Sequence, residues 1–78
     1  MSRFSKWSVI WDTIEEAPLH VWRGLPFSKQ EASRLVWQIY QRSIGIGYHF
    51  RRDPELGFLE VERERLAEHD VIWVRRRG

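Results

Sequence analysis

Residues 27–44 read FSKQEASRLVWQIYQRSI, and their pattern predicts the helix around which the rest of the chain is arranged. Ser28 and Glu31 have the spacing of a capping box, in which each side chain accepts a hydrogen bond from the backbone N–H of the other residue. Apolar residues recur with the helical spacing that makes a single buried stripe: Ala32, Leu35, Val36, Ile39 and Tyr40. Gly45 and Gly47 are expected to end this helix.

The segments on both sides of this helix predict five β-strands. The first two, residues 7–14 and 19–23, flank a turn at Pro18 and are expected to pair as a hairpin. In the first of them the expected core-facing residues are Trp7, Val9, Trp11 and Thr13. The three strands after the helix are expected at residues 46–51, 58–63 and 71–75.

One strong turn and one ambiguous segment separate these last three strands. In the turn DPELG, Pro54 fixes φ and Gly57 permits a positive φ, which predicts a hairpin between its flanking strands. In the strand that follows the turn, Leu59 and Val61 are expected to face the core. Residues 64–70 fit either one helical turn or a longer loop.

The predicted order β-β-α-β-β-β indicates an α+β fold. A helix with one apolar stripe needs a sheet to cover that stripe, so we expect an antiparallel sheet with a single helix packed on one face. The other face of such a sheet can remain partly open to water. The chain has 78 residues and is expected to form one domain, residues 1–78, that ends in a short basic tail at residues 75–78.

Composition limits the classes of function that fit. The 13 basic residues nearly balance the 11 acidic ones, so no strong overall field points to nucleic acid. The chain has no cysteine, and it lacks both the apolar run of a signal peptide and the run of about 18 apolar residues that spans a membrane. We therefore expect a complete small cytoplasmic protein without a membrane anchor. Its aromatic content of 14% exceeds what a small core holds and indicates an interface.

No arrangement of residues in the sequence indicates catalysis, a metal or a cofactor. His20, His49 and His69 lack the spacing of metal ligands on one helix, although paired strands could bring two histidines together for acid–base cleavage of RNA. The stretch Asp53-Pro54, followed by Glu60-Val61-Glu62, resembles the acidic pattern of metal-dependent nucleases of the restriction type, but Glu62 stands where that pattern needs a lysine. We therefore expect a protein that is not an enzyme.

Candidate binding residues lie on the predicted helix and near the predicted strands. Trp37 falls off the apolar stripe beside Arg34 and Gln41, which is the composition of an interface hot spot unless another segment covers the ring. Trp22 is expected on the open face of the sheet if Leu19 faces the helix. The arginines expected to contact a partner are Arg51, Arg52, Arg75, Arg76 and Arg77.

Two functions fit these residues. The first is a small protein–protein interaction module that inhibits or adapts a larger protein or ribonucleoprotein complex. In size and layout, a small sheet with one helix, the chain resembles virus-encoded inhibitors of host defence such as anti-CRISPR proteins, and this resemblance implies such an inhibitor.

The second function is a small RNA- or DNA-binding protein. Sheet aromatics such as Trp22 or Tyr48 would stack on bases, and the arginines would hold phosphates. We favour the first function, because no RNA-binding signature is present and the acidic residues between 55 and 70 would repel phosphates. A homodimer is compatible with either function.

Overall fold

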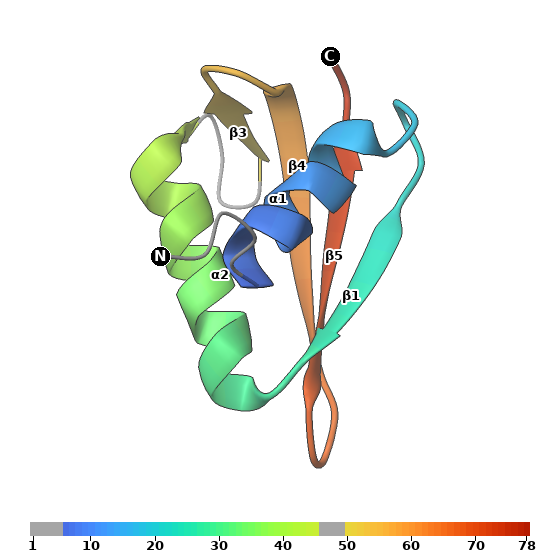
Figure 1. Ribbon diagram of the computed structural model, residues 1–78, viewed down its shortest axis with the longest axis vertical. Coiled ribbons are helices and arrows are strands. Elements are labelled where there is room, and N and C mark those ends of the chain that lie inside the picture. Colours follow the sequence, from blue (N-terminus) through green and yellow to red (C-terminus); the bar gives the residue numbers. More distant parts are fainter. Residues whose placement is uncertain (1–5, 46–49) are drawn as a thin grey trace.

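The structure is a computed structural model and describes residues 6–45 and 50–78. Its elements follow the order α1 (Lys6–Glu16), β1 (Arg23–Phe27), α2 (Lys29–Arg42), β2 (Ile44–Gly45), β3 (Phe50–Asp53), β4 (Gly57–Arg65) and β5 (Asp70–Arg76). Within these residues the strands form one five-stranded antiparallel sheet in the order β1-β5-β4-β3-β2 (Figure 1). The predicted α+β class and antiparallel sheet are therefore confirmed.

Both helices pack on the same face of the sheet, so the expectation of a single helix is wrong. Ile14 of α1 and Leu35 of α2 belong to one buried apolar cluster with Leu59 of β4. Figure 1 shows α1 crossing in front of β4 and β5, with α2 beside it. The order in the described residues is α-β-α-β-β-β-β, which differs from the predicted order in its first element, a helix, and in the additional short strand β2 after α2.

The first predicted strand, residues 7–14, is helical in the structure. Its buried and half-buried apolar residues have the spacing i, i+3, i+4 and i+7, and they are Trp7, Ile10, Trp11 and Ile14. Val9 and Thr13, which were expected to face the core, are exposed, and the Thr13 hydroxyl donates to Val9 O at 2.9 Å as it does inside a helix. The expected core face of Trp7, Val9, Trp11 and Thr13 is therefore wrong.

The second predicted strand, residues 19–23, is also wrong. Residues 19–22 form a connection in which His20 adopts a positive φ of 66°, a conformation that does not occur in a strand. The His20 N–H donates to Arg76 O at 2.7 Å and anchors this connection to the end of β5. The sheet strand β1 follows, in the segment that was expected only to lead into the helix, and Pro26 suits its position at the edge of the sheet.

The predicted central helix is confirmed, with slightly narrower bounds than residues 27–44. Ser28 is its N-cap and accepts a hydrogen bond from the Glu31 N–H at 3.2 Å. The Glu31 carboxylate accepts from the Ser28 hydroxyl at 3.2 Å and also pairs with Lys6 of α1. The helix ends in an extended C-cap at Ser43, before Gly45, and Gly47 lies outside the described residues.

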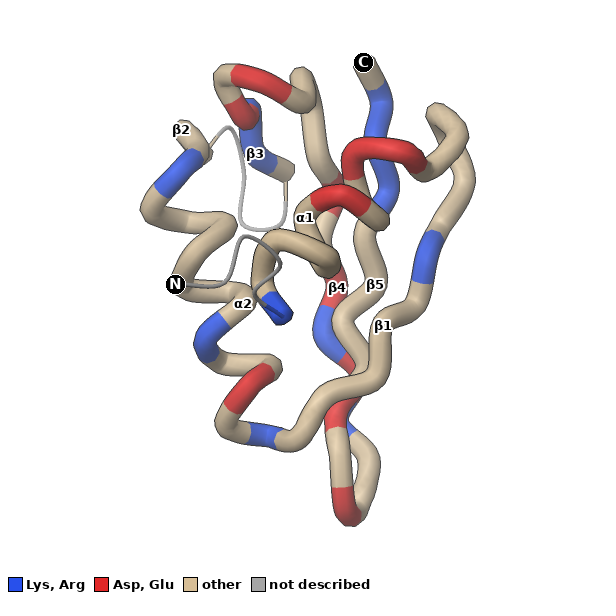
Figure 2. Tube along the Cα trace, in the orientation of Figure 1, with Lys and Arg blue, Asp and Glu red and all other residues tan. Residues whose placement is uncertain are grey.

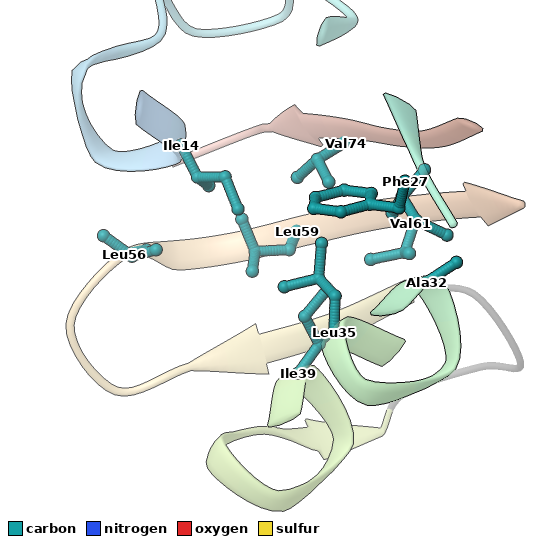
Figure 3. Packing of buried hydrophobic residues seen from close by; sticks show 10 residues of the cluster. Ile14, Phe27, Ala32, Leu35, Ile39, Leu56, Leu59, Val61 and Val74 are labelled. Carbon is teal, nitrogen blue, oxygen red and sulfur yellow. The ribbon is translucent and has the colours of Figure 1, made fainter. Parts of the chain in front are cut away.

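The apolar core lies between the helices and the sheet (Figure 3). Leu59 and Val61 of β4 face it, as predicted, with 0% and 4% of their surface exposed. Alternation along β5 places Ile72 and Val74 on the same side. The other buried members are Ile14, Phe27, Ala32, Leu35, Ile39 and Leu56.

Two fully buried carboxylates hold the ends of α2 to the sheet. Asp70 of β5 pairs with Lys29 in the first turn of α2 at 2.7 Å and with Arg63 of β4 at 2.7 Å. Asp53 of β3 pairs with Arg42 in the last turn of α2 at 3.0 Å. These ion pairs fix the helix at both of its ends, and the apolar stripe packs between them.

The turns that join β3 to β4 and β4 to β5 are short. In the predicted turn, Gly57 has a φ of 80°, and a Cβ there would lie 2.7 Å from the carbonyl carbon of Gly78. The ambiguous segment 64–70 completes β4 through Arg65, and the Leu66 N–H then donates to His69 O at 3.0 Å to close a tight turn. Of the strand expected at residues 46–51, residues 46–49 lie outside the described part of the chain.

Candidate functional site

The face of the sheet opposite to the helices is the first candidate surface, and we call it the open face. Side chains alternate between the two faces along a strand, so the neighbours of the buried residues on β4 and β5 point to the open face. On these two strands the open-face residues are Phe58, Glu60, Glu62, Glu64, Val71, Trp73 and Arg75. Strands β1 and β3 add Gly24, Pro26, Phe50 and Arg52.

One row across the open face joins an indole, a guanidinium group and a carboxylate. The Arg75 guanidinium lies 4.6 Å from the ring centroid of Trp22 and donates to both oxygens of Glu60, at 2.8 and 2.9 Å. Arg77 Nη1 donates to Glu60 Oε1 at 2.9 Å. These hydrogen bonds, first from Arg75 and then from Arg77, lower the pKa of Glu60 below its ordinary value. The ionised carboxylate therefore holds both arginines at the surface of the sheet.

The next row holds a cleft between two indoles. Gly24, Trp73 and Glu62 are neighbours across β1, β5 and β4, and Trp22 lies in the adjacent row. Trp22, Trp73 and Glu62 line a cleft of about 340 Å³. A Cβ on residue 24 would lie 2.8 Å from the Trp73 ring, so the glycine lets this indole rest against β1. The Trp73 Nε1–H donates to Glu64 Oε1 at 3.1 Å, which fixes the ring plane.

The other end of the open face carries apolar and basic groups. Phe50 and Phe58 stack with their ring centroids 5.4 Å apart. At the corner beside β2, Ile44 is 74% exposed and lines a depression with Arg42, Arg52 and Pro54. Arg52 itself is exposed at this corner.

The outer side of α2 is the second candidate surface, which we call the helix surface. Trp37 is 62% exposed there, and Arg34 and Gln41 beside it are exposed as well. Tyr40, three positions further along α2, is 36% exposed. None of the described segments covers most of the Trp37 ring, so the sequence-predicted group of Trp37, Arg34 and Gln41 lies together at the surface.

Arg51 and Arg76 lie on the helix face of the sheet, the face on which both helices pack. Arg51 donates from Nε to the Ser43 hydroxyl at 2.7 Å and from Nη2 to Ser43 O at 3.1 Å, and its guanidinium stacks on Tyr40. Arg76 donates to the carbonyls of Glu15 and Ala17 at the end of α1. Both side chains cap helix C-termini and do not join Arg52, Arg75 and Arg77 on the open face.

The expected basic tail is part of the sheet. Arg75 and Arg76 lie in β5, and the Arg77 N–H donates to Phe58 O at 2.8 Å. The expectation of a tail at residues 75–78 is therefore wrong for these three arginines. They are held by strand pairing, which also directs their side chains alternately to the two faces.

Sequence reasoning did not select Trp73, Glu62 or Glu64, although together with Trp22 they form the cleft and its acidic border. The signal was present in the alternation of β5, where Trp73 stands between the inward-facing Ile72 and Val74. A run of four apolar residues, here 71–74, is typical of a strand that is buried on both faces, whereas only Ile72 and Val74 are buried in this strand.

An apolar groove lies on the helix side of the molecule, between α1 and β1. Its volume is about 610 Å³, and Val9, Ile10 and Leu25 contribute to its apolar lining. The ion pair between Lys6 and Glu31 borders it. The groove contains none of the residues that the sequence singled out for binding.

The described residues contain no group of three or more side chains of His, Cys, Asp or Glu that could hold a metal ion. His20 and His69 lie in connections at opposite ends of β5, and His49 lies outside the described residues. Neither of the two described helices is long and apolar enough to cross a membrane. No protein-family model, no curated protein and no solved structure matches this chain.

Proposed function

We propose that this protein is a small protein–protein interaction module that inhibits or adapts a larger protein complex. The observation that carries this proposal is the exposure of 62% of Trp37 on the helix surface. Small virus-encoded inhibitors such as anti-CRISPR proteins have this kind of role. The partner is a protein whose surface accepts the Trp37 ring.

The position of Trp37 on α2 separates its role from that of the core. Ala32, Leu35 and Ile39 on the other side of the helix are fully buried and hold α2 to the sheet. Trp37 contributes nothing to that core, and a tryptophan ring that is exposed in this way can bury about 150–250 Å² in a contact. Tryptophan and arginine are the residue types most enriched among interface hot spots, and Arg34 lies one helical turn from Trp37.

The balance of charge on the open face also supports a protein partner over nucleic acid. Arg75 and Arg77 share the carboxylate of Glu60, so part of their charge is neutralised within the sheet. Glu62 and Glu64 continue the acidic row along the middle of this face. Basic and acidic residues also alternate along β4 in Figure 2, without a continuous basic stripe. The phosphates of a nucleic acid bound to this face would lie against this acidic row and be repelled by it.

The first experiment is capture of partners from a bacterial lysate with and without nuclease, followed by mass spectrometry. A partner retained after nuclease treatment is expected under this proposal. Retention that depends on nucleic acid, with an affinity that falls linearly in log salt, would replace the proposal by the RNA- or DNA-binding function.

The second experiment measures affinity for the captured partner after Trp37→Ala. We expect a loss of about 2 kcal/mol or more, which is about 30-fold, because the ring anchors the contact. Glu68→Gln is the matched control, since Glu68 is exposed in the turn between β4 and β5 and away from α2. Thermal melts of both variants verify that the fold is intact. Unchanged affinity of a folded Trp37→Ala variant would overturn the assignment.

A further inference from the structure

We infer that the partner of the helix surface is acidic and places a carboxylate group beside the site that accepts the Trp37 ring. This inference rests on the proposed function, because it names the chemistry of the partner that binds the same surface. It is drawn from the charges on the outer side of α2, where basic side chains outnumber their acidic partners (Figure 2).

The helix itself offers no unpaired carboxylate. α2 lies wholly within the described residues, and its one acidic residue is Glu31, whose carboxylate pairs with Lys6 of α1. The exposed side chains of α2 are basic, polar or aromatic, and they are Lys29, Gln30, Ser33, Arg34, Trp37, Tyr40 and Gln41. A partner that docks on this side of the helix therefore meets basic groups and no competing acidic one.

Arg34 is the basic group that lies beside Trp37. It is exposed, and among the described residues its guanidinium has no ion pair and no hydrogen bond. Residues three positions apart on a helix have their Cβ atoms about 5–6 Å from one another, so a carboxylate that pairs with Arg34 lies next to the Trp37 ring. All the donors of this guanidinium are available for a bidentate pair with such a carboxylate.

The first turn of α2 adds a positive charge near Arg34. Lys29 and Arg63 share the one carboxylate of Asp70, each at 2.7 Å, which leaves one positive charge in excess. Arg63 also donates to the Ser33 hydroxyl at 3.1 Å, so its guanidinium lies against the residue that precedes Arg34. The charge around Arg34 is therefore positive beyond that of its own side chain.

A further positive charge lies near the other end of α2. Arg51 donates to the Ser43 hydroxyl and to the carbonyls of Ser43 and Tyr40, and its guanidinium stacks on the Tyr40 ring. These acceptors are neutral groups, and the dipole at the end of the helix offsets only about half of one charge. Tyr40 follows Trp37 by one turn, so positive charge lies on both sides of Trp37 along the helix.

Exposed carboxylates lie on other parts of the molecule, such as Asp12, Glu15 and Glu16 on α1. An acidic partner surface is repelled there and attracted to the outer side of α2, so the charge pattern selects both the partner and its orientation. A nucleic acid fits less well, because a single strand stacks its bases on several rings along a basic groove. Of the two rings on α2, only Trp37 is more than half exposed.

The first test selects ligands from a random peptide library displayed on phage, with the full chain immobilised. Clones that bind the wild type but not Trp37→Ala report on the helix surface. We expect these clones to be enriched in Asp and Glu over the unselected library and to bind Arg34→Gln about two- to fivefold more weakly. Clones that need Trp37 but are neutral or basic would overturn the inference and leave the proposed function standing. If no clone depends on Trp37, both fail.

The second test reverses the charge and measures affinity for the partner captured from the lysate. Arg34→Glu is expected to lower this affinity at least about tenfold, since it sets like charges against one another. Arg23→Glu is the matched control, because Arg23 is also exposed and β1 lies on the other side of the view from α2 (Figure 1). Equal losses in the two variants would show that net charge alone attracts the partner, and the inference would fail.

Salt and a nucleic-acid probe complete this test. Added salt is expected to weaken binding of the wild type more than binding of Arg34→Gln, because the variant lacks one of the charges that salt screens. Thermal melts verify that each variant is folded. An affinity for the partner that ignores both salt and Arg34→Gln would overturn the inference while the loss in Trp37→Ala still supports the proposed function. Binding of a labelled oligothymidylate that requires Trp37 and Arg34 would assign the surface to nucleic acid instead.

Discussion

Arginine side chains have different partners on the two faces of the sheet. On the helix face, Arg51 and Arg76 donate to the last carbonyls of α2 and α1, where a positive charge also complements the helix dipole. On the open face, Arg75 and Arg77 share the carboxylate of Glu60. Arg75 and Arg76 are adjacent in sequence, yet they serve different faces because side chains alternate along β5. The role of an arginine in this chain therefore follows from strand register and not from its place in a basic run.

The largest expected effect is on the free energy of unfolding, and it separates the buried side of α2 from its exposed side. Leu35→Ala removes a fully buried side chain, so it is expected to lower the free energy of unfolding by about 2–5 kcal/mol. Trp37→Ala, on the exposed side of the same helix, is expected to change it by less than about 0.5 kcal/mol. Urea denaturation measures both values. Similar losses in the two variants would contradict the separation between a structural and a binding side of α2.

The second difference concerns the two carboxylates whose pKa values are lowered. Hydrogen bonds from Lys29 first, and then from Arg63, lower the pKa of Asp70 against the opposing effect of burial. A lowered pKa in the folded state gives stability that is fully present above the unfolded value of about 3.9 and is lost as the pH falls through the folded value.

The corresponding variants are Asp70→Asn on the helix face and Glu60→Gln on the open face. We expect Asp70→Asn to have a lower free energy of unfolding than the wild type at pH 7. Between pH 5 and 2 its free energy of unfolding is expected to fall less than that of the wild type, because the variant lacks the carboxylate whose protonation removes part of the wild-type stability. Glu60→Gln is expected to change the same profile less, since Glu60 is 23% exposed and Asp70 is fully enclosed. Urea midpoints measured across this pH range give both profiles. A larger change of the pH profile in Glu60→Gln than in Asp70→Asn would contradict the greater contribution of the buried Asp70 carboxylate to stability.

The smallest expected difference in the free energy of unfolding is between substitutions of the two adjacent arginines Arg76 and Arg77. Arg76→Met removes the donors that cap α1, and we expect a loss of about 1–2 kcal/mol in the free energy of unfolding and a lower helical signal in circular dichroism. Arg77→Met removes only a partly exposed ion pair, for which we expect a loss of about 0–1 kcal/mol and an unchanged helical signal. Equal effects of both substitutions on the helical signal would argue against the capping role of Arg76.

The prediction of α2 succeeded because its signals are local. Ser28 and Glu31 lie three positions apart, and the stripe from Ala32 to Ile39 spans two helical turns. The hairpin at Gly57 succeeded for the same reason, since its backbone conformation depends on neighbouring residues. Of the candidate site, Trp37, Arg34 and Gln41 lie together as expected, because positions on one helix have a fixed spacing.

The prediction of a strand at residues 7–14 failed because two periodicities overlap there. Trp7 and Trp11 fit both the alternation of a strand and the spacing of a helix, whereas Ile10 and Ile14 fit only the helix. The rich content of β-branched and aromatic residues then favoured the strand. An isolated helix of this length is marginal in water, so its contacts with other elements decide its conformation.

Those contacts are specific and come from distant parts of the chain. Trp7 stacks on Phe27 with 6.3 Å between ring centroids, and the Trp11 Nε1–H donates to Gln38 Oε1 at 2.9 Å. Trp11 also packs against the guanidinium of Arg42. These partners lie in β1 and α2, beyond the reach of any local pattern.

The amino-acid sequence by itself determined the class of the fold and the features that depend on residues within a few positions of one another. These features are the helix α2, the turn at Gly57 and the inward-facing pair Leu59 and Val61. The helical state of α1, the cleft between Trp22 and Trp73 and the partner of each arginine follow from the packed structure. They depend on strand register and on contacts between segments up to 61 positions apart, as between Arg76 and Glu15. Local propensity does not encode such contacts, since they form only when the elements meet.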